Sequence, residues 1–166
     1  GIVLIHVATL LHDRGYDSAA VQVSRAAIAS QRDTLGNNHP HTLNSITNTG
    51  VLLRHLGRIE EAEALGAEAV RGARAELAAS SPFRLSAMAQ YGRTLTVSGR
   101  FAEAETLLRE SYDGVVQAQS LDHRWAIETI QSLVALYDAW HTAQPGKGYD
   151  ASAADWREKL PEENGE

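Results

Sequence analysis

Seven histidines are the residues with the most specific chemistry in this chain, because imidazole is a common zinc ligand. No two of them are four residues apart, the spacing that places two ligands on one face of a helix. His39 and His41 flank Pro40 in an expected connector between helices. The 166 residues include no cysteine, which excludes thiolate ligands and disulfides. We therefore expect no metal site and no cofactor.

Two short stretches contain letters of catalytic motifs. Ser120, Asp122 and His123 carry the side chains of a catalytic triad, but they are neighbours at an expected helix start. A helix cap explains them better, since a triad is defined by geometry and not by closeness in sequence. The run Gly146-Lys147-Gly148 lacks the GxxxxGK[ST] frame of a phosphate-binding loop. We expect no catalytic residues and no enzymatic activity.

The strongest signal in the chain is an internal repeat of 42 residues. Gly15, Gly57 and Gly99 are 42 residues apart, and many other residues recur at the same offset. The matching pairs are Gly50 and Gly92, Leu53 and Leu95, Arg58 and Arg100, Ala62 and Ala104, Glu63 and Glu105, Leu65 and Leu107, and Pro40 and Pro82. A fixed period of this length predicts stacked helix pairs that share one elongated core.

Apolar residues at helical spacing predict where the helices lie around these glycines. We expect helices over residues 2–14, 17–35, 43–56 and 59–77, a third pair from 82 to 118, and a fourth pair beginning near 122. An insertion of about six residues, within 141–148, precedes a last helix that ends near Leu160. The expected repeats are 1–36, 37–78, 79–120 and 121–160, within one domain spanning 1–161, and 162–166 is an acidic tail.

Three local expectations follow from the repeat. The turn at Gly15 should be one residue shorter than its two relatives. Asn38, Ser80 and Asp122 lie 42 residues apart and should cap the first helix of their repeats. Gly50 and Gly92, together with Ala62 and Ala104, should lie where helices cross, so that a larger side chain would push the helices apart.

The motifs Leu35-Gly36-x-x-His39-Pro40-x-Thr42-Leu43 and Gly57-Arg58-x-Glu60-Glu61-Ala62-Glu63 resemble tetratricopeptide repeats of the 42-residue kind found in kinesin light chains. Gly99-Arg100-Phe101-Ala102-Glu103-Ala104-Glu105 is a second copy of the latter motif. The run from Leu136 to Trp140 and the run from Ala154 to Pro161 also resemble the C-terminal repeats of large bacterial serine/threonine protein kinases. The resemblance implies an all-α, right-handed superhelical solenoid of about four antiparallel helix pairs.

In this family the first helix of each pair lines a concave groove that holds a peptide or a partner helix. Carried over by position, the resemblance implies a groove lined by Asn44, Thr47, Asn48, Val51, Arg54, His55, Ser86, Gln90, Arg93, Glu128, Gln131 and Asp138. Asn48 and Gln90 lie where such repeats often place an amide that bonds the ligand backbone. Since Arg54 and Arg93 are basic and Glu128 and Asp138 acidic, we expect a partner of mixed polarity.

Two readings of the groove stay open beside each other. The first is a protein–protein interaction scaffold that binds an external protein or peptide. The alternative is a structural or intramolecular regulatory segment of a larger bacterial signalling protein, such as a serine/threonine kinase. A third interpretation of the same residues is a solvated helix face without any ligand, because fold analogy is weak support for function.

Composition limits the remaining partners. A formal net charge of −6 argues against a nucleic-acid surface, which needs clustered Lys and Arg. The apolar run Ile2–Leu11 is too short to span a bilayer and has no basic front end, so we expect a cytoplasmic protein without membrane contact. This run begins without a cap or an initiator methionine, which favours a chain cut from a longer protein. Its apolar residues predict a homodimer through Ile2, Val3, Ile5 and Leu10.

Overall fold

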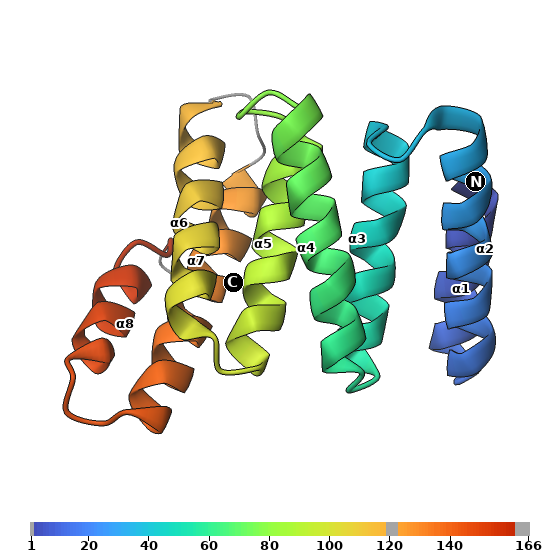
Figure 1. Ribbon diagram of the computed structural model, residues 1–166. Helices are drawn as coiled ribbons and strands as arrows, with labels where there is room; N and C mark the ends of the chain where they lie inside the picture. The colour runs from blue at the N-terminus through green and yellow to red at the C-terminus, as the bar shows by residue number, and fades with distance from the viewer. Residues whose placement is uncertain (1, 119–122, 162–166) are drawn as a thin grey trace.

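The computed structural model describes residues 2–118 and 123–161. The expected tail at 162–166 and the expected cap Asp122 lie outside these residues. The described chain forms helices only (Figure 1): α1 (Ile2–Asp13), α2 (Asp17–Leu35), α3 (Pro40–His55), α4 (Ile59–Glu76), α5 (Pro82–Val97), α6 (Phe101–Gln117), α7 (His123–Ala143) and α8 (Tyr149–Arg157). The expected all-α solenoid of helix pairs is confirmed. None of these helices combines the length and the apolarity needed to cross a membrane.

The turn inside each of the first three pairs has one geometry, and glycine is required in it. Gly15, Gly57 and Gly99 have φ of 79°, 72° and 79°, a region that other residues rarely adopt. At the second turn the amide of Gly57 donates to Arg54 O at 3.0 Å and that of Arg58 donates to Leu53 O at 2.9 Å. The first and third turns repeat both bonds, which together form a Schellman motif. The expectation of a shorter first turn is therefore wrong.

The fourth pair departs from the period, as expected. The helix start that the period places at residue 143 is found at Tyr149. Part of the insertion extends α7 to Ala143, and the rest forms a loop in which Gly146 and Gly148 have positive φ. Trp140 stacks on Tyr149 with ring centroids 4.1 Å apart, and on Phe101 at 5.6 Å. This aromatic stack fastens the loop and α8 to the third pair.

The predicted helix caps at Asn38 and Ser80 are wrong by one position. Proline is the first residue of both α3 and α5. The residue before a proline is pushed into an extended conformation, so it becomes the cap. His39 caps α3, and its Nδ1 accepts the amide of His41 at 3.2 Å. Ser81 takes the same place before α5 without a side-chain bond.

The expectation of crowded helix crossings holds at Gly92 and fails at Gly50. A Cβ at Gly92 would lie 2.7 Å from Leu108 Cγ, whereas a Cβ at Gly50 would meet nothing closer than Ala62 O at 3.7 Å. The reason is the residue across the crossing. Leu108 faces Gly92, but the same position of the second repeat is Gly66. Tyr91 fills the space beside Gly66, where a Cβ would lie 2.4 Å from its ring.

The first helices of the pairs lie on the inner side of the array. α3 packs against α5, and α5 packs against α7. Each second helix also packs against the first helix of the next pair, α2 on α3, α4 on α5 and α6 on α7. Among the described helices the second helices do not pack closely on one another, so they spread apart on the outer side. Figure 1 shows the pairs side by side from α1 and α2 at one end to α8 at the other.

Candidate binding surface on the first helices

The predicted groove residues come from α3, α5 and α7, and most of them reach the inner surface. The exposed ones are Asn48, His55, Glu128, Gln131 and Asp138, and the half-buried ones are Asn44, Val51, Arg54, Ser86, Gln90 and Arg93. Thr47 is only 5% exposed, and its hydroxyl donates to Leu43 O at 2.9 Å. Its hydroxyl is therefore occupied inside α3.

Arg54 ties α3 to α5. Its Nη1 donates to the backbone oxygen of Gln90 at 3.1 Å, and its Nη2 donates to Gln90 Oε1 at 3.3 Å. Thr94 Oγ1 is a further acceptor, 3.4 Å from Nη1. All three acceptors are uncharged, so these bonds orient the guanidinium without neutralising it.

Arg93 ties α5 to α7 in a similar way. Its Nε donates to Ser132 Oγ at 2.7 Å, and its Nη2 donates to the backbone oxygen of Glu128 at 3.1 Å. Ser132 in turn donates to the same Glu128 oxygen at 2.6 Å, and this bond orients its hydroxyl oxygen to accept from Arg93. The two arginines thus form consecutive links along the inner surface, one from α3 to α5 and one from α5 to α7.

The two guanidiniums carry positive charge that the described part of the chain leaves without an ion pair. Burial is the main cause that lowers the pKa of Arg54, and the charge of Arg93 lowers it further. Burial also lowers the pKa of Arg93, against an opposing effect from the Glu128 carboxylate. Both arginines still remain protonated near neutral pH, because a guanidinium keeps its proton in proteins. A half-buried cation of this kind favours a carboxylate or another oxyanion brought by a partner.

A hollow of about 340 Å³ lies at the α1 end of this surface. Its lining includes Asn48, Val51 and His55 from α3 and His12 from α1, and the two imidazole rings are 6.3 Å apart. Burial chiefly lowers the pKa of His55, and Arg54 and then His12 lower it further. The hollow therefore offers an amide and two histidines beside an apolar wall.

A smaller hollow, of about 100 Å³, lies between α5 and α7. Ser86, Gln90, Arg93 and Glu128 line it, together with Trp125 from α7. The structure thus brings four of the predicted residues together around Arg93. Asp138 has a different role, since its Oδ2 lies 2.5 Å from Arg157 Nη2 on α8.

Sequence reasoning missed two residues of this surface. His12 lies 42 residues before Arg54, so the repeat register applied to the first helix would have found it. Thr94 was not among the predicted groove residues; it is only 3% exposed, but its hydroxyl lies within hydrogen-bond distance of Arg54. Its place directly after the groove position Arg93 was the signal available in the sequence.

Within the described residues no three histidine, aspartate or glutamate side chains gather as a metal site would require. The rings of His39 and His41 lie near the start of α3 with centroids 5.4 Å apart and a tilt of 33°, and Phe83 from α5 packs edge-on against His41. These contacts join the starts of two first helices. The arrangement on the inner surface is therefore one of hydrogen-bond donors, cations and small hollows, which suits non-covalent binding.

The glycine turns, the paired helices and the inner surface define a helical-repeat protein. The family model described as tetratricopeptide repeat matches residues 2–75 and 50–115, and the chain belongs to this family. Its expected resemblance to kinesin light chains extends to the fold. This chain is similar to a crystal structure of the nearly identical TPR-like repeats of a putative kinesin light chain from Podosopora anserina. The TM-score is 0.76 at 23% sequence identity, and the match covers 96% of this chain and 76% of that one.

A second crystal structure, of a substituted form of the same repeats, gives a TM-score of 0.78 and 23% identity, over 94% of this chain and 70% of that one. At this identity the likeness concerns the fold alone. A comparison with curated proteins gives no match. The resemblance to bacterial kinase repeats stays a prediction, as do the repeat boundaries within 1–161.

Proposed function

We propose that this chain is a non-catalytic scaffold that binds a peptide or partner segment along the inner surface of α3, α5 and α7. Tetratricopeptide repeats are typically interaction scaffolds, and the family membership supports that general role. The observation that carries the specific proposal is the pair Arg54 and Arg93. Both are half-buried cations whose hydrogen-bond acceptors are uncharged oxygens.

The partner chemistry follows from the surroundings of the two arginines. A carboxylate next to Arg93 would form charge-assisted hydrogen bonds, which are about twice as strong as neutral ones. Asn48 is exposed on α3, where its amide can pair with the backbone of the same segment. Glu128 and Gln131, exposed on α7, favour a basic or amide group further along. We therefore expect a segment whose acidic part lies over α3 and α5 and whose opposite end is basic or amide-rich.

The experiment is a pull-down from an extract of the source cells with the immobilised chain. We expect a specific partner that is lost when Asn48→Ala and Arg93→Ala are combined. Arg14→Ala is the matched control, because Arg14 is an exposed residue at the end of α1, outside the inner surface. A partner that survives the double substitution would contradict the proposal.

A second candidate is that the groove serves a longer chain of which this repeat array is one part, such as a bacterial signalling kinase. Val7 and Leu10 on α1 favour it, since they are 39% and 52% exposed at the end of the array. Terminal repeats normally carry a polar outer face. In the same pull-down, binding only to the other parts of the parent chain would support this second candidate against the first.

A further inference from the structure

The outer side of the array contains a hollow larger than the two described on the inner side. It has a volume of about 470 Å³ and lies between α4 and α6, over α5. Val70, Leu95 and Leu107 form its floor, with exposed fractions of 5%, 0% and 7%. Tyr91 from α5 closes the floor. A volume of this size is in the range of ligand-binding pockets, and its floor is apolar.

The hollow exists because α4 presents small side chains to α6. Gly66 leaves room for the Tyr91 ring to lie against α4, since a Cβ there would be 2.4 Å from Tyr91 Cδ2. Ala67 lines the hollow, whereas the same position of the next repeat is Arg109. The spreading of the second helices on the outer side leaves the space between α4 and α6 unfilled.

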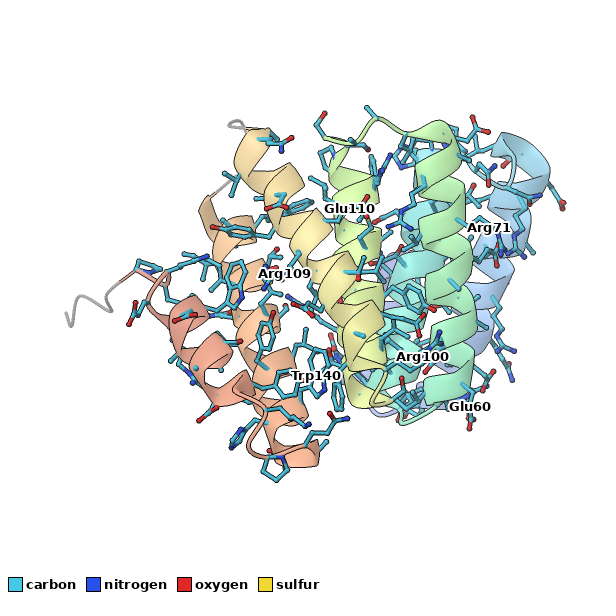
Figure 2. The ribbon with its side chains drawn as sticks, turned by 60° about the vertical axis from the view of Figure 1, so that its left-hand side comes forward. Glu60, Arg71, Arg100, Arg109, Glu110 and Trp140 are labelled. Carbon is cyan, nitrogen blue, oxygen red and sulfur yellow. The ribbon has the colours of Figure 1, made fainter. Side chains whose placement is uncertain are left out.

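Most charges at the rim are already paired. Glu103 lies 2.7 Å from Arg100, which also binds Glu63, and Arg74 pairs with Glu110. Figure 2 shows Arg100 directly before α6, Glu110 on α6 and Arg71 on α4. Arg71 is exposed and has no ion pair within the described residues. It is thus a cation at the rim of an apolar hollow, in a chain whose net charge is negative.

A second hollow lies on the other side of Arg71. It has a volume of about 480 Å³ between α2 and α4, and its lining includes Asn37, Asn38 and the paired Arg32 and Glu68. Arg71 lines both hollows. An extended chain that crosses α4 can therefore place one side chain in the apolar hollow, a carboxylate on Arg71 and its backbone beside the two asparagines. A small organic acid could reach the hollow and Arg71, but it has no peptide backbone to lie beside the asparagines.

We propose that the outer surface between α2 and α6 binds a partner peptide in which a bulky apolar side chain adjoins an acidic one. The apolar side chain occupies the hollow over Val70, Leu95 and Leu107, and the acidic side chain pairs with Arg71. The complementarity is one of charge and of size. This site is separate from the inner surface and does not depend on Arg54 or Arg93.

The test is an NMR titration of the isotope-labelled chain with the acetylated and amidated peptide Ser-Gly-Leu-Asp-Gly-Ser. A contact of this size binds weakly, with a Kd of about 1 mM. We expect shifts of backbone amides in α4 and α6, and weaker shifts when the peptide carries Asn in place of Asp or Ala in place of Leu. 4-Methylpentanoate, which has the apolar group and the carboxylate but no chain, should bind more weakly still.

Two variants and two controls decide the outcome. Arg71→Glu should weaken the peptide about tenfold, because it replaces an attraction by a repulsion of similar size. Ala67→Leu should fill the hollow and weaken it independently of charge. Arg14→Glu changes the net charge equally, and Arg93→Glu alters the inner surface, so neither should affect binding. Shifts confined to α3, α5 and α7, equal binding to Arg71→Glu, or an equal response to 4-methylpentanoate would overturn the proposal.

Discussion

The substitution of alanine for Gly50 or for Gly92 should change stability in opposite directions, although the two glycines occupy the same repeat position. Alanine in place of a glycine inside a helix ordinarily stabilises by about 0.5–1 kcal/mol. At Gly50 the nearest atoms to a new Cβ are 3.7 Å and 3.8 Å away, which is ordinary van der Waals contact. Gly50→Ala should therefore stabilise the chain by about this amount.

At Gly92 the same Cβ would lie 2.7 Å from Leu108 Cγ and 2.9 Å from Leu108 Cδ2. Leu108 is fully buried and belongs to the main core cluster, so it cannot move aside freely. Overpacking of this kind costs about 1–3 kcal/mol, which exceeds the helix gain. Gly92→Ala should lower the free energy of unfolding by about 1 kcal/mol.

Thermal unfolding followed by far-ultraviolet circular dichroism measures both variants beside the parent chain. The expected difference between them, about 2 kcal/mol, corresponds to roughly 4–8 °C in Tm for a chain of this size. The control is the double variant Gly92→Ala with Leu108→Ala, compared with Leu108→Ala alone. Once the Leu108 side chain is removed, the new methyl group should cause no further loss of stability. Equal Tm values for Gly50→Ala and Gly92→Ala would refute the reasoning from helix-crossing distances.

Three other substitutions test separate parts of the structure. Trp140→Ala should remove the stack that holds residues 149–157, so hydrogen exchange should quicken in α8 and stay unchanged in α3; uniform quickening would contradict a local role. Burial lowers the pKa of His55 in the folded state, so below about pH 6.5 this residue binds more protons in the unfolded state than in the folded one. Acidification should therefore lower the stability of the fold. His55→Gln should lessen the loss of Tm between about pH 7 and about pH 5, and an unchanged loss would show that other groups dominate. We propose that the chain pairs through α1, so Ile2→Glu with Ile5→Glu should give a helical monomer; sedimentation of the unmodified chain as a monomer would refute this pairing.

The fold could be predicted from the sequence because the information is carried by backbone requirements that recur at a fixed period. The backbone has a positive φ at Gly15, Gly57 and Gly99, and glycine is the residue that adopts this conformation readily. The turns are therefore visible in the sequence as glycines at a fixed spacing. The departure of the fourth pair could be predicted for the same reason, since the loss of the period marks the insertion before Tyr149.

The details of packing could not be read from the period, because they depend on residues at different repeat positions. The space at Gly50 is set by Gly66, and the space at Gly66 is taken by Tyr91 from the next repeat. The cap at His39 depends on Pro40 beginning α3, which shifts the cap by one residue from Asn38.

The candidate groove could likewise be predicted only in part. The repeat register placed Asn48, Gln90 and Arg93 on the first helices, and the structure puts them at the inner surface. The register could not show that Arg54 and Arg93 bond to uncharged acceptors on the neighbouring helix, because those bonds depend on side-chain conformations. It also could not show the outer hollow, which results from the spread of α4 and α6.

The most direct test of the central proposal is a map of where a selected ligand lies. Peptides enriched from a random library on the immobilised chain would be titrated into the isotope-labelled chain, and the shifted backbone amides assigned. The proposal predicts acidic peptides whose shifts cluster on α3, α5 and α7, whose affinity falls with salt, and whose affinity falls about tenfold in Arg93→Glu but not in Arg14→Glu. Shifts that avoid these three helices, or binding that is indifferent to both salt and Arg93→Glu, would contradict it.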